Sequence, residues 1–176
     1  LMPGRLTYWK GQEKLIEAMN ILIEDYNNSN FQAILLGSDQ GRKVYKKKLI
    51  DLVQRYRLSQ KIKFIDHCKE MPLAYTISDV VISSSIEPEA FGRVAVEAQS
   101  MEKIIIASNI GGSNETIIND ETGLLFESGD AMSLSKKIIQ ALTMDESSTK
   151  LMGKEGRKNV IKKFNVEKMC FSTYSE

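Results

Sequence analysis

The 176-residue sequence contains only two cysteines, Cys68 and Cys170, and only three prolines. Two cysteines are too few for a disulfide framework, so we expect a reducing, cytoplasmic location. With three scattered prolines, no proline-rich linker divides the chain. No apolar run approaches the roughly 20 residues that a membrane helix needs. The formal net charge is only +1, which gives no support for a nucleic-acid partner.

Hydrophobic residues make up 42% of the sequence and charged residues 27%, a mixture typical of soluble globular proteins. The sequence opens on Leu-Met-Pro-Gly, without an initiator methionine and in the pattern of a strand end. We therefore expect a piece of a longer protein.

Short apolar runs alternate along the chain with stretches whose apolar residues follow helical spacing. In the second such stretch, we expect Val44, Leu49 and Val53 to face inward. This alternation predicts an α/β fold, a Rossmann-like doubly wound parallel sheet with helices on both faces. We expect strands at the chain opening and over 31–36, 61–65, 79–83, 103–107 and 124–126, and helices over 12–26, 44–56, 71–77, 92–100, 130–142, 148–164 and the chain end, 165–176.

Ligands of such sheets bind in the loops at the carboxyl ends of the strands. The first of these loops, residues 4–11, contains the cations Arg5 and Lys10 between two glycines. A guanidinium fork and an ammonium near a helix start suit phosphate oxygens. The alternative is that both are solvated loop charges.

The loop over 83–92 leads into a helix, with Glu89 in the loop and Glu97 on the helix. Gly92 permits a close backbone approach where that helix begins, and its free N–H groups can bind a diphosphate without a metal. Glu97 can accept hydrogen bonds from a ribose diol. The alternative is that both carboxylates face solvent.

Two other loops contain glycine pairs. The loop over 37–41 has the spacing G-x3-G, which is not a dinucleotide fingerprint and favours a tight turn. After the strand over 103–107, Gly111 and Gly112 allow the backbone to turn tightly over a ligand, and Ser113 or Asn114 can cap the short helix that follows.

Taken together, these loops resemble the C-terminal, nucleotide-binding half of a GT-B glycosyltransferase of the retaining group 1 (family 4) kind. The resemblance covers nearly the whole chain. It rests on four motifs in order, namely Gly4-Arg5-Leu6 with Lys10-Gly11, Glu89 to Glu97 with Phe91-Gly92, Gly111-Gly112 with Glu115, and Thr122-Gly123-Leu124-Leu125.

The resemblance implies a role for each matched position. Arg5 and Lys10 would contact the donor diphosphate, Glu97 the ribose hydroxyls and Glu89 the donor sugar. The stretch from Asp66 to Lys69 falls where members contact the nucleobase. The implied catalytic residues are Arg5, Lys10 and Glu89, and the implied donor-binding residues are Gly4, Asp66, His67, Phe91, Gly92 and Glu97.

The resemblance also implies partners and cofactors. The donor would be a UDP- or GDP-linked sugar, and neither a metal nor another cofactor is expected. His67 is the only histidine, and one histidine beside Cys68 cannot form a zinc site. The lysine runs over 46–48 and 162–163 are expected to be solvated helix faces, with a peripheral contact at the inner membrane face as the alternative.

The resemblance implies that residues 1–164 form the nucleotide-sugar-binding domain of a retaining glycosyltransferase of the hexosyltransferase type. This enzyme would act in the synthesis of a cell-envelope polysaccharide or glycolipid. The N-terminal acceptor domain is absent from this chain, so we expect the isolated chain to be inactive. The alternatives are a non-catalytic nucleotide-sugar-binding module and a GT-B nucleotide-sugar isomerase. The sequence departs from the family pattern at Ser84 and Asn114, near which members often have proline.

Overall fold

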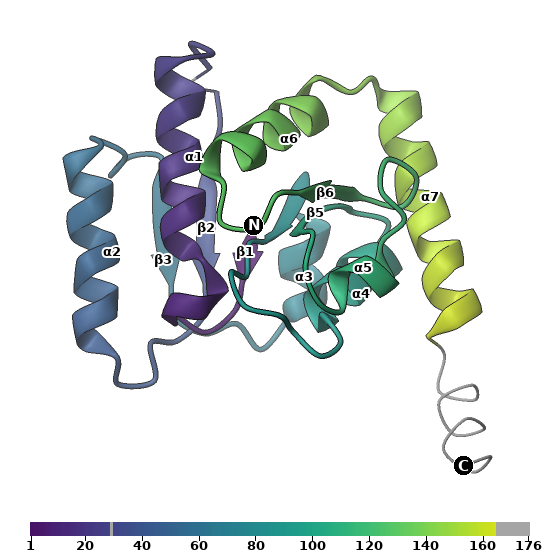
Figure 1. The fold of residues 1–176 in the computed structure, drawn as a ribbon, viewed down its shortest axis with the longest axis horizontal. Helices are drawn as coiled ribbons and strands as arrows, with labels where there is room; N and C mark the ends of the chain where they lie inside the picture. Colours follow the sequence, from purple (N-terminus) through teal and green to yellow (C-terminus); the bar gives the residue numbers. More distant parts are fainter. Residues whose placement is uncertain (29, 165–176) are drawn as a thin grey trace.

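The computed structural model describes residues 1–28 and 30–164, whose strands are all parallel. Leu1 joins the two groups of strands, since its amine donates to the carbonyl of Val80 (2.8 Å) and its carbonyl accepts from the N–H of Ile82 (2.8 Å). One group holds β1 (Met2–Pro3), β2 (Ala33–Leu36) and β3 (Ile62–Ile65), and the other holds β4 (Val80–Ser83), β5 (Ile104–Ser108) and β6 (Leu124–Phe126). The combined order is β3-β2-β1-β4-β5-β6. Figure 1 shows β3, β2 and β1 on one side of the molecule and β5 and β6 on the other.

This order confirms the predicted α/β, Rossmann-like fold. From β1 and β4 the strand order runs outward to opposite edges of the sheet, and ligands of such sheets bind beside this switch point at the carboxyl ends of the strands. The predicted helix over 165–176 lies outside the described residues. The helices are α1 (Gln12–Glu24), α2 (Lys43–Arg55), α3 (Met71–Thr76), α4 (Arg93–Ser100), α5 (Ser113–Thr116), α6 (Ala131–Thr143) and α7 (Glu146–Lys163), with a 3₁₀ turn η1 at Tyr8–Lys10.

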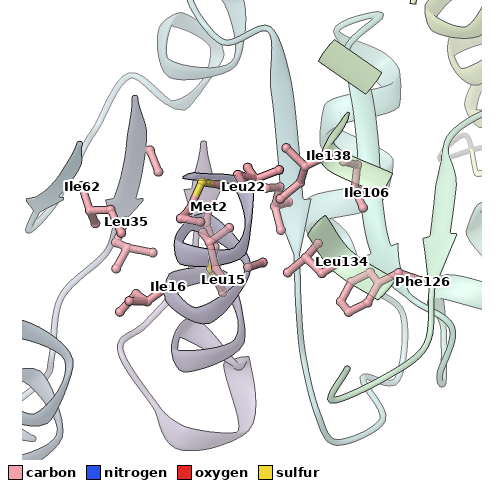
Figure 2. Close-up of a cluster of buried hydrophobic side chains, with 14 of the residues drawn as sticks. Met2, Leu15, Ile16, Leu22, Leu35, Ile62, Ile106, Phe126, Leu134 and Ile138 are labelled. Carbon is pink, nitrogen blue, oxygen red and sulfur yellow. The ribbon is translucent and has the colours of Figure 1, made fainter. Parts of the chain in front are cut away.

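Alternate residues of β5 face two separate hydrophobic clusters, as the two-residue period of a strand requires. Ile104 and Ile106 join the larger cluster, which α1 and α6 cover (Figure 2). Ile105 and Ala107 join the smaller cluster on the other face, with Tyr75 of α3 and side chains of α4. Helices therefore cover both faces, and the smaller cluster fixes α3 and α4 next to each other.

One expectation about burial is wrong. Val44 was expected to face inward, but its exposed fraction is 87%. At 3.6 residues per turn, Val44 lies about 140° around α2 from Leu49, so it cannot share the buried face. The strand β3 lies at the edge of the sheet, and Ile65 is exposed there.

Within residues 1–28 and 30–164, no helix has the length and apolarity to cross a membrane.

The loops that follow β1 and β4 are in direct contact at Gly11. Gly11 has a φ of 72°, and a Cβ placed there would lie 1.9 Å from the carbonyl oxygen of Ser84. The buried Ser84 hydroxyl in turn donates to the carbonyl of Gly11 (3.0 Å). At this departure from the family pattern, a hydrogen bond therefore fixes the shape of the loop.

The loop after β5 packs against the loop after β4 in the same way. A Cβ on Gly111 would lie 2.7 Å from the carbonyl oxygen of Glu89, and one on Gly112 would lie 2.6 Å from the carbonyl carbon of Phe91. The N–H of Gly112 also donates to the carbonyl of Glu89 (2.8 Å). The glycine pair thus holds the loops of β4 and β5 together.

We predict that Gly11→Ala destabilises the fold more than Gly41→Ala does. Both glycines have positive φ, so alanine costs about 1–2 kcal/mol of backbone strain at either position. Only at Gly11 does the new methyl group also meet backbone, whereas nothing lies within 4 Å at Gly41. Overpacking adds about 1–3 kcal/mol. Urea unfolding of both variants measures the difference, and equal losses would show that the loop contact contributes nothing.

Candidate functional site

A cleft of about 530 Å³ opens at the carboxyl ends of β1, β2 and β3, beside α3 and α4. It contains five of the predicted residues, which come from three separate segments of the chain. It lies at the side of the sheet where the switch point between β1 and β4 predicts a crevice. The five are Gly4, Arg5, Asp66, His67 and Glu97.

Partly buried hydrogen bonds from two helices hold the loop that contains Arg5. The side-chain amide of Gln12, at the start of α1, donates to the carbonyl of Arg5 (2.8 Å). The hydroxyl of Tyr45, on α2, donates to the Gln12 amide oxygen (3.2 Å). Burial is the main reason why the pKa of Tyr45 is raised, so this phenol remains a donor. The Arg5 side chain itself is exposed and lines the cleft.

Lys10 and Glu89 form an ion pair beside the cleft. The Lys10 ammonium lies 2.7 Å from Glu89 Oε1, and only 12% and 17% of the two side chains are exposed. The hydroxyl of Ser85 donates to the same carboxylate oxygen. The Lys10 ammonium also lies 4.5 Å from the centroid of the Trp9 ring, close enough for a cation–π contact. Lys10, which was predicted to contact the diphosphate, and Glu89, which was predicted to contact the sugar, therefore neutralise each other's charge in this structure.

The Lys10 side chain passes close to the cleft at Gly4. A Cβ on Gly4 would lie 3.7 Å from the Lys10 Cδ and Cε atoms, at ordinary contact distance. Any side chain beyond a methyl group would therefore compete with Lys10 for this space. Gly4 lines the cleft and so connects it to the Lys10–Glu89 pair.

Phe91 and Gly92, at the start of α4, lie outside the lining of the cleft. Gly92 caps α4 with a φ of 73° and is buried. The Phe91 ring packs edge-on against Phe164, with centroids 5.4 Å apart. Through this contact, the end of α7 supports the loop that contains Glu89.

Glu97, on α4, interacts closely with one neighbouring side chain and loosely with another. The Tyr75 hydroxyl donates to Glu97 Oε2 (2.6 Å), while Arg93 Nε lies 3.7 Å from Glu97 Oε1. Burial, followed by the bond to Glu97, raises the pKa of Tyr75. The carboxylate itself is partly exposed and retains free acceptor positions toward the cleft.

The sequence interpretation missed Tyr75, Ser85, Gln12 and Tyr45. Tyr75 precedes Glu97 by 22 residues, and no spacing rule connects the two. The role of Gln12 follows from its burial, which only the structure shows, since a buried amide needs hydrogen-bond partners. In the described part of the chain, no group of three or more His, Cys, Asp or Glu side chains is placed to hold a metal ion.

A second cavity, of about 430 Å³, lies on β2 and β4 next to α3. Its walls are mostly apolar, and it contains none of the predicted site residues. Binding sites need a few placed polar groups as well as an apolar wall. The cleft with Arg5 and Glu97 is therefore the candidate functional site.

Residues 1–159 match the family described as glycosyl transferases group 1. Curated relatives include the capsular polysaccharide biosynthesis glycosyltransferase CapM of Staphylococcus aureus, 29% identical over 92% of this chain and 41% of CapM. Another is the D-inositol 3-phosphate glycosyltransferase of Corynebacterium diphtheriae, 28% identical over 85% of this chain and 35% of that protein. The chain thus spans about two-fifths of the length of these relatives.

Solved structures of the same kind superpose over nearly the whole chain. A glycosyltransferase from Rickettsia africae has a TM-score of 0.92 and 33% identity, covering 99% of this chain and 45% of that one. Anabaena Alr3699/HepE, in complex with UDP-glucose, has a TM-score of 0.89 and 28% identity, covering 99% and 48%. The C-terminal domain of LpcC from Francisella tularensis has a TM-score of 0.82 and 27% identity, covering 94% and 85%. With the family match over 159 of its 176 residues, this chain belongs to the group 1 glycosyltransferases of GT-B fold, in which it corresponds to the C-terminal domain.

Proposed function

We propose that this chain binds the nucleotide-diphosphate sugar donor of a retaining glycosyltransferase. The observation that carries the proposal is the cleft, where the Arg5 guanidinium and the Glu97 carboxylate share one hollow with Gly4. A cation for phosphate oxygens and an anion for hydroxyls in one cleft suit a ligand that has both groups. Anabaena Alr3699/HepE, solved with UDP and with UDP-glucose, supports this class of ligand.

In the reaction we propose, the bond between the sugar C1 and the diphosphate oxygen breaks, and the diphosphate leaves with the electron pair. Arg5, Lys10 and the N-terminal end of α4 stabilise the negative charge that grows on it. Asp66 and His67 also line the cleft, and we assign them to recognition of the nucleobase. We assign no metal to the site, because these cationic groups supply the neutralising charge.

For the whole protein, we propose transfer of the sugar to an acceptor held by an N-terminal half, in synthesis of a cell-envelope polysaccharide. The printed function of CapM, capsular polysaccharide biosynthesis, supports this direction. We infer that the isolated chain binds a donor without transferring it, since a GT-B cleft needs both halves.

We predict that Arg5→Ala weakens binding of UDP and GDP by about 10- to 100-fold. The reason is the loss of a charge-assisted contact to phosphate, worth about 1.5–3 kcal/mol. Titration calorimetry with the purified chain measures both affinities. Arg42→Ala is the matched control, because it removes the same charge from an exposed residue of a neighbouring loop that does not itself line the cleft. Equal affinities for the Arg5 variant and the wild type would contradict the diphosphate role.

We also predict that Glu89→Gln strengthens binding of the bare nucleoside diphosphate, by roughly three- to tenfold. Lys10 is neutralised by Glu89 in the structure, so a diphosphate must compete with that carboxylate for the ammonium. Removing the negative charge ends the competition.

The matched control for this prediction is Glu87→Gln, an exposed carboxylate of the same loop. Its removal changes the net charge equally but frees no cation. Calorimetry with UDP and GDP compares the two variants. If Glu89→Gln binds both nucleotides no more tightly than Glu87→Gln does, the Lys10–Glu89 pair does not limit binding.

A further inference from the structure

Glu97 has one fixed partner and one loose partner. The Tyr75 ring is 2% exposed and packs in the smaller hydrophobic cluster, with its hydroxyl 2.6 Å from Glu97 Oε2. Arg93 lies 3.7 Å from the other oxygen, with 84% of its side chain exposed. An exposed pair of this kind contributes little, since water screens it and the long side chain loses entropy. The orientation of the carboxylate therefore depends mainly on Tyr75.

The hydrogen bond leaves the carboxylate with defined free positions. An ionised carboxylate accepts at about four lone-pair sites, and Tyr75 occupies one of those on Oε2. Both residues line the cleft, so the remaining sites are available to a ligand there. Burial, and then the hydrogen bond to Glu97, raises the pKa of Tyr75, so its hydroxyl stays protonated at neutral pH and remains a donor.

Tyr75 is itself held in place by the packing and the hydrogen bonding of its helix. Its helix α3 is held to α4 and β5 by the smaller cluster, and Lys103, just before β5, donates to the carbonyl of Thr76 (2.7 Å). A carboxylate that turned freely would present its lone pairs in many directions and would lose entropy on binding two hydroxyls. A carboxylate held in advance avoids that loss.

We propose that Tyr75 is a positioning residue that orients Glu97 toward the vicinal hydroxyls of the ribose, and so sets the preference for ribose over deoxyribose. This inference rests on the proposed function of the cleft. Tyr75 need not touch the ligand, because it acts through the carboxylate.

The test compares UDP and GDP with their 2′,3′-dideoxy analogues, by calorimetry on the purified chain. In Tyr75→Phe, which keeps the buried ring, we expect binding of UDP or GDP to weaken roughly tenfold, by loss of a hydrogen bond to a charged group. Binding of the dideoxy analogue, which offers no hydroxyls to Glu97, should stay unchanged. Combined with Glu97→Gln, Tyr75→Phe should have no further effect.

Tyr56→Phe is the matched control, since it removes a hydroxyl from a tyrosine at the end of α2, outside the cleft. An unchanged affinity for UDP and GDP in Tyr75→Phe would overturn the inference, and so would equal losses for the natural and dideoxy nucleotides. If the wild-type chain binds neither UDP nor GDP, the proposed function itself fails, whereas tight binding with no effect of Tyr75→Phe refutes only the positioning role.

Discussion

The site depends on the close approach of the loops that follow β1 and β4. Gly11 fits against the Ser84 carbonyl with no room for a side chain, and the Ser84 hydroxyl bonds back to the Gly11 carbonyl. Below them, β1 is short, and the backbone hydrogen bonds that connect it to β4 are the two made by Leu1. Contact between the loops therefore completes the central junction of the sheet, and it places Lys10 of the β1 loop beside Glu89.

Helices hold the groups of the cleft in place from behind. Gln12 and Tyr45, on α1 and α2, fix the backbone at Arg5, while Tyr75, on α3, fixes the Glu97 carboxylate. Each of these supports is a buried or half-buried side chain, so its hydrogen bond is protected from competing water. The hydrogen bonds that position the exposed residues of the cleft are therefore made within the chain itself and do not depend on a bound ligand.

Much of the fold could be predicted from the sequence, because the alternation of buried runs and amphipathic stretches is a local signal. The strand 124–126 was predicted to the residue. Of the residues assigned to the donor, Arg5 and Glu97 line one cleft, whereas Lys10 is paired with Glu89 beside it. The supports could not be predicted in the same way. Tyr75 and Glu97 meet across two elements, and the Lys10–Glu89 pair joins positions 79 residues apart. The expectation that Val44 faces inward was wrong for a different reason, since an apolar residue in a helix need not lie on its buried face.

The ion pair between Lys10 and Glu89 has a consequence for selectivity. A ligand that offers only phosphate draws Lys10 away and leaves Glu89, with 17% of its side chain exposed, holding a poorly solvated charge. A ligand that also has a hydroxylated sugar gives Glu89 new donors in exchange for the lost ammonium. The Ser85 hydroxyl keeps the carboxylate in place during this exchange. If the cleft binds a donor as proposed, we infer that the pair favours a diphosphate with a sugar attached over a bare diphosphate, because only the former leaves both charges satisfied.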